Sequence, residues 1–152
     1  MNKQKLLLKQ VTEKLKPWGS LGAQVRSARG WINTVRQALG MTTTQLANKL
    51  GVNQSRVVQL EQAEASDAIT LRTLRKAAEA MECQLIYAIV PRESLENILR
   101  RQARRVAGRQ MEQVSHSMLL EQQAVTPAQK EEQLNILTEE LMQALGSKLW
   151  SE

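Results

Sequence analysis

The sequence predicts an all-α chain with one short β-strand. Apolar residues recur every three or four positions through most of its length, which is the spacing of one face of an α-helix. Residues that begin helices, such as Thr42, Thr70 and Thr126, stand just before several of these stretches. The aromatic fraction is 3%, with no Phe and three prolines, so we expect a core of aliphatic side chains and Met.

The length of 152 residues is enough for one compact domain with extensions. The first residues, MNKQKLLLKQVTEK, contain too short an apolar run for a signal peptide, and no segment approaches the roughly 20 apolar residues that cross a bilayer. Cys83 is the only cysteine, which excludes an internal disulfide and disfavours a zinc site. We therefore expect a cytoplasmic protein with no membrane contact, metal or cofactor.

Charge is distributed unevenly along the chain, whose net charge is +6. Residues 1–110 contain 19 Lys and Arg against 8 Asp and Glu, whereas residues 111–152 contain 2 against 7. A strongly basic segment favours binding to a polyanion, because each neutralised phosphate releases condensed counterions. The alternative is a solvated basic surface that serves solubility. On the first interpretation, the two parts of the chain contact different partners.

Two helices are predicted in the first forty residues. A leucine and valine stripe in residues 3–16 indicates a leading helix, and the sequence PWGSLG at 17–22 interrupts it as a linker. Apolar residues recur at helical spacing again over 31–39, where Gly40 provides a natural end. This second helix is the first one expected to contribute to the core.

The next stretch, TTTQLANKLGVNQSRVVQLE, predicts two short helices separated by a glycine. Thr42 and Gln45 form a capping box, in which each side chain satisfies a free backbone N–H at the helix start. Gly51 ends this helix, and Asn53 is a suitable N-cap for another over residues 54–63. Because so few residues separate the two helices, they must cross steeply.

The second of these helices has two contrasting sides. On a helical wheel, Val57 and Leu60 define the buried side. The opposite side carries amides and short side chains instead of the Glu and Lys that are common on solvated helices. Gln pairs with adenine, Arg reaches guanine or phosphate, and Ser contacts several bases. The alternative is a helical hairpin that only fills a core. The residues predicted to read bases are Gln54, Ser55, Arg56 and Gln59.

A helix over 71–82, capped by Thr70, precedes the segment CQLIYAIVP at 83–91. This segment is apolar on both faces, rich in β-branched residues and closed by a proline, so it predicts a buried strand. No second strand is apparent, and unpaired backbone groups are costly when buried. We therefore expect the strand to pair with its copy in a homodimer. The predicted dimerisation residues are Leu85, Tyr87 and Ile89.

Two further helices are predicted after the strand. The first covers residues 93–122, and the second begins at Thr126 and Pro127 and ends at Gly146. The leucines of the second form a narrow seam that requires another helix. The seam packs either against the 93–122 helix or across a dimer axis, and the sequence leaves both arrangements open.

Four arginines form two i, i+4 pairs of like charge in the first of these helices. Such pairs repel by a few tenths of a kcal/mol, which argues against a stabilising role. The sequence leaves two alternatives, a solvated face or contacts to flanking phosphates. The residues are Arg100, Arg101, Arg104 and Arg105.

The run from Thr42 to Glu61, with its surroundings over residues 30–82, resembles the helix-turn-helix of the XRE class, which includes lambda-type repressors and Cro. A wider likeness, through GWINTVRQALGM and QLEQAEASDAITLRTLRKAAEAMECQLIYAIVPRESLE, is to the family called mobile mystery protein A. Its members tend to be encoded beside a Fic-domain protein. The resemblance implies a lambda-repressor-like fold and a homodimeric DNA-binding regulator with a toxin–antitoxin association.

The resemblance also implies roles for individual residues. Gln54, Ser55, Arg56 and Gln59 match its base-reading positions, and two such helices in a dimer read a near-palindromic operator about 34 Å apart. Residues at the start of the preceding helix lie where backbone amides and the helix dipole suit a DNA phosphate. Independently of the resemblance, arginines before the first core helix are expected to reach the backbone or a minor groove as an arm. These backbone residues are Thr42, Thr43, Gln45, Arg26 and Arg29. The expected domains are an N-terminal helix and linker (1–22), the helix-turn-helix DNA-binding domain (23–82), the dimerisation strand (83–91) and C-terminal helices for dimerisation or partner binding (92–152).

The expected function is repression of transcription, with autoregulation of an operon that also encodes a Fic-domain partner. The alternative is an antitoxin that neutralises a Fic-type toxin through the acidic residues 111–152. Catalysis is not expected, because His116 and Cys83 do not form a nucleophile and base pair that the sequence supports. The operator and any inducer are not predicted.

Overall fold

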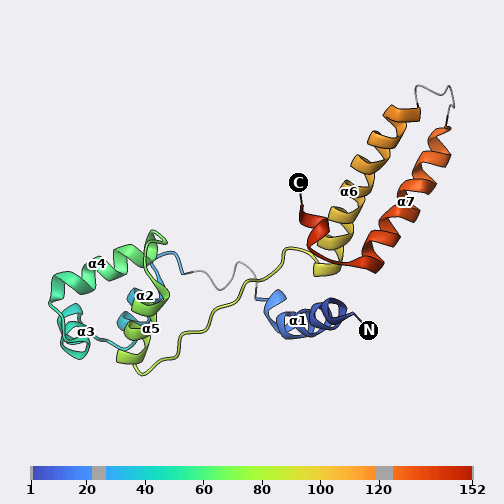
Figure 1. The fold of residues 1–152 in the computed structure, drawn as a ribbon. Helices are drawn as coiled ribbons and strands as arrows, with labels where there is room; N and C mark the ends of the chain where they lie inside the picture. The colour runs from blue at the N-terminus through green and yellow to red at the C-terminus, as the bar shows by residue number, and fades with distance from the viewer. Residues whose placement is uncertain (1, 22–26, 119–124, 152) are drawn as a thin grey trace. The chain divides into compact units, whose positions relative to one another are not determined.

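A computed structural model describes residues 2–21, 27–118 and 125–151. Within these ranges the chain forms seven α-helices and a short 3-10 helix, η3 (Figure 1). The elements are α1 (Lys3–Gly19), α2 (Trp31–Ala38), α3 (Thr43–Leu50), α4 (Gln54–Ala65), α5 (Leu71–Ala80), α6 (Leu95–Met118), α7 (Pro127–Ala144) and η3 (Ser147–Trp150). They belong to two compact units, Leu21–Ile89 and Met1–Ser20 with Val90–Glu152. Among these helices, none has the length and apolar character needed to cross a membrane.

The helix starts follow the predicted capping chemistry. Thr42 Oγ1 accepts a hydrogen bond from the Gln45 N–H at 3.1 Å, and the Gln45 side chain accepts one from the Thr42 N–H at 2.8 Å. Thr126 and Gln129 form the same reciprocal pair at the start of α7. Between α3 and α4, Gly51 adopts a φ of 67°, a left-handed conformation that residues with a Cβ rarely adopt. The predicted capping box of Thr42 and Gln45, the predicted helix start at Thr126 and this glycine turn are confirmed.

The linker predicted at 17–22 is wrong in its first residues, because α1 continues through Pro17 to Gly19. Proline lacks a backbone N–H, but in the last turn of a helix its cost is confined to the helix end. The helix predicted over 93–122 ends at Met118 among the described residues, and the rest of that prediction lies outside them.

The core of the unit Leu21–Ile89 lies among α2, α3, α4 and α5. It is aliphatic, as the composition predicts, and each fully buried aliphatic side chain contributes about 1.5–3 kcal/mol. Val57 of α4 is at its centre, fully buried. The buried members are Ile32, Leu46, Ala47, Val57, Leu60, Ala77 and Met81. This packing fixes which side of α4 faces outward.

In the other unit, α6 and α7 lie side by side as an antiparallel hairpin (Figure 1). Its core consists of Ala103, Met142, Leu145 and Leu149, with Leu99 and Leu141 packed against them. The leucine seam of α7 therefore packs on α6 of the same chain, which decides between the two arrangements that the sequence left open. The side chain of Gln102 donates to the Leu149 carbonyl and holds η3 against α6.

Two of the four arginines of α6 pair with acidic residues of α7, a role that the sequence did not suggest for them, whereas Arg101 pairs with Glu93 and Arg105 is exposed. Arg100 contacts Glu139, and Arg104 contacts Glu131. The hydrogen bond and charge of Glu139 raise the pKa of Arg100 above its ordinary value. Residues 95–150 contain seven Lys and Arg and seven Asp and Glu. The charge asymmetry of the sequence is therefore partly an internal complementarity between these two helices.

In the described structure of the single chain, the segment predicted as an intermolecular strand at 83–91 forms no strand. After α5 the Cys83 N–H donates to the Ala78 carbonyl, and the following residues are in neither helix nor strand in the described structure. Ile86, Tyr87 and Ile89 are exposed by 61%, 62% and 88%. A strand requires a neighbour for its backbone groups, and the described parts of one chain do not provide it.

Candidate functional site

The two sides of α4 differ as the helical wheel predicts. Val57 and Leu60 point into the core and are buried. The side chains on the opposite side are all exposed: Gln54, Ser55, Arg56, Val58, Gln59 and Gln62. Asn53 accepts a hydrogen bond from the Arg56 N–H at 2.8 Å and caps the helix. The amide-bearing side is thus accessible to a large ligand along its whole length.

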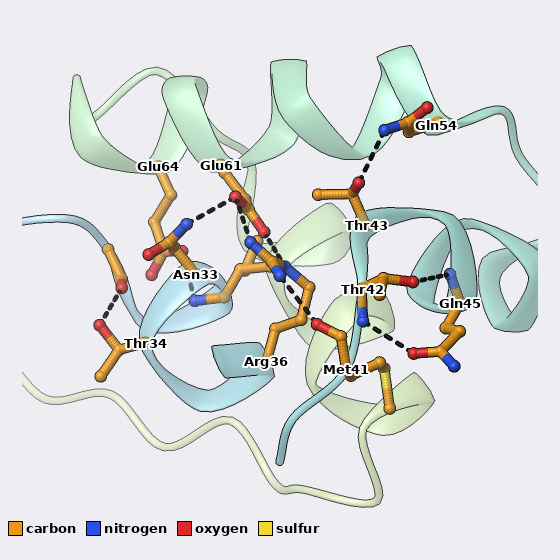
Figure 2. A network of polar contacts seen from close by, with 12 residues as sticks. Asn33, Thr34, Arg36, Met41, Thr42, Thr43, Gln45, Gln54, Glu61 and Glu64 are labelled. Carbon is orange, nitrogen blue, oxygen red and sulfur yellow. Dashed lines mark hydrogen bonds and ion pairs between the residues drawn. The ribbon is translucent and has the colours of Figure 1, made fainter. Parts of the chain in front are cut away.

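The inner side of α4 is held by a buried ion pair, which Figure 2 shows in the network around Arg36. The Arg36 Nε donates to Glu61 Oε1 at 2.5 Å, and the Asn33 side chain donates to Glu61 Oε2 at 2.7 Å. Arg36 Nη1 also donates to the Met41 carbonyl at 2.8 Å. The side chains of Arg36 and Glu61 are only 10% and 11% exposed. This network ties α4 to α2 and to the residues that begin α3.

Burial and pairing act on the Glu61 carboxylate in opposite directions. Burial raises the pKa of Glu61, whereas the hydrogen bonds from Arg36 and Asn33 and the charge of Arg36 lower it. The pairing outweighs the burial, and the pKa lies below its ordinary value. The carboxylate is therefore ionised at neutral pH and accepts from Arg36 Nε, Arg36 Nη2 and the Asn33 side chain.

A second carboxylate of α4 caps the start of α2. Glu64 Oε1 accepts from the Trp31 N–H at 2.6 Å, and Oε2 accepts from the Ile32 N–H at 2.8 Å. A negative charge at a helix N-terminus is favourable because the helix dipole is positive there. Gly30 has a φ of 82°, and a Cβ on it would lie 2.8 Å from Glu64 Oε2. The approach of the carboxylate therefore requires glycine at this position.

Polar contacts also order the exposed end of α4. Gln54 Nε2 donates to Thr43 Oγ1 at 3.0 Å, joining the first residues of α4 and α3 (Figure 2). Arg56 Nη1 lies 3.5 Å from Gln59 Oε1, one turn further along α4. These contacts restrict the rotamers of long side chains before any ligand binds, which lowers the entropy cost of binding.

The structure brings most of the predicted site residues together. Gln54, Ser55, Arg56 and Gln59 occupy the exposed side of α4, and Thr42, Thr43 and Gln45 lie at the start of α3. Arg29 is exposed just before α2, whereas Arg26 lies outside the described residues. Leu85 is half-buried, and Tyr87 and Ile89 are exposed.

The residues that hold α4 in place were not predicted. The signal was present, because Glu64 falls at about the same wheel angle as Val57 and Glu61 falls beside it. Arg36 likewise follows the buried Ile32 by one turn in α2. Charged residues on a buried face require partners. The sequence could therefore have predicted that Arg36, Glu61 and Glu64 form polar contacts between α2 and α4.

Comparison with known families agrees with this geometry. Residues 32–87 match a family model described as helix-turn-helix. The chain therefore contains an XRE/Cro-like helix-turn-helix domain over these residues, and this class supports DNA binding by a transcriptional regulator. This match supports neither membership of the mobile mystery protein A family nor a Fic-domain partner. Neither a curated protein nor a solved structure matched the chain.

Proposed function

We propose that the protein is a sequence-specific regulator of transcription that binds double-stranded DNA and represses its own operon. The observation that carries this proposal is the division of α4 into two sides. The ion pair of Glu61 with Arg36, the Glu64 carboxylate and buried aliphatic residues hold its inner side, whereas its amide-bearing side is exposed. A helix with these properties is suited to the major groove, which is wide enough to admit it.

In this proposal the exposed residues near the start of α4 read the bases. Gln59 pairs bidentately with adenine, and Arg56 reaches guanine or a phosphate. Gln54, held by Thr43, and Ser55 contact the edges of neighbouring bases. These side chains lie within the first two turns of α4, so one domain reads only a few base pairs. A second domain is needed for an operator of useful length, and we propose a homodimer on a near-palindrome.

The start of α3 supplies contacts to the DNA backbone. The N-termini of helices favour phosphate because of their dipole, and Thr43 lies there beside Thr42 and Gln45. Arg29, exposed before α2, adds a positive charge. The unit Leu21–Ile89 contains eight Lys and Arg against five Asp and Glu. Because this excess is small, we expect a shallow salt dependence with only a few counterions released per domain.

The test is a matched pair of glutamine substitutions, Gln59→Ala and Gln133→Ala. Both positions are exposed on a helix, but Gln133 is in α7. The operator is first selected from random duplexes with the wild-type protein. Gln59→Ala should weaken operator binding by about 1–3 kcal/mol and relax preference at one base position, while Gln133→Ala leaves both unchanged. Equal losses on operator and random DNA for Gln59→Ala would contradict base reading.

We do not extend the proposal to neutralisation of a Fic-type toxin. The sequence feature behind that alternative was the acidic stretch 111–152. Glu131 and Glu139 of this stretch are paired with arginines of α6, so their charge is already partly compensated within the chain. A Fic-domain partner rests on the family resemblance alone.

A further inference from the structure

The segment after α5 is an exposed apolar stretch with no charge of its own. Between Glu82 and Arg92 the sequence contains no charged residue, and Ile86, Tyr87 and Ile89 are largely exposed. Figure 1 draws the segment as irregular chain between α5 and α6. Contiguous exposed apolar residues mark an interaction surface, because water contact is unfavourable for them. A partner of this segment must satisfy both its side chains and its backbone.

The backbone of this segment points to another strand. Residues 84–91 form no backbone hydrogen bond with another described residue. An extended segment offers a row of donors and acceptors on each edge, and strand addition satisfies one such row completely. Apolar side chains on both faces suit a pairing in which each face packs against further residues. A helical partner would leave the backbone groups unpaired.

We propose that the partner is the same segment of a second copy, paired antiparallel with Tyr87 at the two-fold axis. In this register Leu85 lies opposite the partner's Ile89, and Ile86 lies opposite the partner's Ala88. Residues with the same parity share a face, as antiparallel pairing requires. Large apolar residues therefore meet across the pair on one face, and Pro91, which cannot donate to the ladder, falls at its end.

Charge complementarity fixes this register. Centring the pair on Tyr87 places Glu82 opposite the partner's Arg92 at both ends. Both residues are exposed, and neither has an ion pair with another described residue. Sliding one strand by two residues along the other places Glu82 opposite Val90 or Ser94 instead. Sliding it by one residue places the odd-numbered residues of one strand on the same face as the even-numbered residues of the other. Opposite charges across a strand pair are favourable, so the centred register is the one selected.

The paired segments would join two copies of α4 in one dimer. The importance of this pairing for DNA recognition rests on the proposed function. The test of the pairing itself needs no DNA. In a Cys83→Ser background, single cysteines are introduced by Tyr87→Cys and by Ile89→Cys. Residues opposite each other in antiparallel strands are about 4.5–5.5 Å apart between Cα atoms, within the range for a disulfide. Position 89, in contrast, is separated from its own copy by about 13 Å.

Under mild oxidation the full-length Tyr87→Cys protein should form a disulfide-linked dimer about tenfold faster than the Ile89→Cys protein, because pairing raises the local thiol concentration. Random collision would favour position 89, which is the more exposed. Equal rates, or faster linkage at 89, would overturn the proposal. A mixture of Leu85→Cys and Ile89→Cys proteins should also link, and failure of that mixture would overturn the register.

Charge reversal gives a second, independent test by sedimentation. Arg92→Glu should weaken the dimer about tenfold, because it places two negative charges opposite each other at each end. Adding Glu82→Arg should restore it, whereas Arg105→Glu, an equal charge change in α6, should have no effect. A monomeric wild-type protein at tens of micromolar (roughly the range of weak association) would also refute the pairing. Base discrimination by Gln59 is measured separately, so either proposal can fail alone.

Discussion

The buried ion pair between Arg36 and Glu61 makes a quantitative prediction for Glu61→Ala. The substitution removes the acceptor for Arg36 Nε at 2.5 Å, for Arg36 Nη2 at 3.2 Å and for Asn33 at 2.7 Å. Breaking a buried pair by removing one partner costs about 3–5 kcal/mol. In the Glu61→Ala protein, Arg36 keeps its hydrogen bond to the Met41 carbonyl, and its side chain is 10% exposed to water. We therefore expect a loss at the lower end of this range, about 3 kcal/mol of unfolding free energy.

Hydrogen exchange can measure this loss of stability separately in the unit Leu21–Ile89. A change of about 3 kcal/mol lowers the protection of globally exchanging core amides by roughly 150-fold. Peptides covering α3 and α4 should lose this protection, while peptides from α6 and α7 report the other unit as an internal control. The exposed pair of Arg100 and Glu139 provides a matched comparison, because Glu139→Ala should lower amide protection far less than Glu61→Ala does. A loss below 1 kcal/mol for Glu61→Ala would refute the view that this ion pair holds α4 in place.

The remaining predictions concern pH, backbone strain and salt. The pKa of Glu61 is below its ordinary value of 4.5, so its pairing contributes fully to the free energy of unfolding above pH 4.5. This contribution is lost as the pH falls through the lower pKa of the folded state. In urea titrations, Glu61→Gln should therefore reduce the loss of stability at acidic pH. Gly30→Ala should cost about 2 kcal/mol or more by thermal denaturation, because its backbone conformation (φ 82°, ψ 157°) is essentially restricted to glycine and the added Cβ would contact Glu64. Gly51→Ala, at φ 67° and ψ 32°, adds only the strain of the left-handed helical region. Added salt should remove most of the small effect of Glu139→Ala.

Features that depend on near neighbours in the chain were predictable from the sequence. The capping boxes and Gly51 depend on residues within a few positions of each other, and the predicted start of each helix agrees with the structure within about two residues. The exposed side of α4 was likewise predictable, because Val57 and Leu60 mark its buried side through helical geometry alone. The residues proposed to contact DNA follow from that side.

Features that depend on which helices meet were harder to predict. The sequence indicated a basic part and an acidic part with different partners, but Arg100 and Arg104 meet acidic residues of α7 in the same chain. The segment 83–91 has the composition of a buried strand, yet burial requires a neighbour that the described part of one chain does not contain. Glu61 and Glu64 lie on the inner side of α4, and their partners belong to α2, so the pattern of α4 alone does not identify these contacts.

In α4, the residues that hold the helix in the domain differ from the residues that are exposed for binding, and this has an evolutionary consequence. Glu61, Glu64, Val57 and Leu60 fix the helix from within, and none of them is on the side proposed to meet DNA. Substitutions at Ser55 and Gln59 therefore leave these attachments intact, and a substitution at Gln54 removes only its hydrogen bond to Thr43. New operator preferences can arise by drift at a few surface positions, so duplicated copies of such a gene could diverge into independent switches without any loss of foldability.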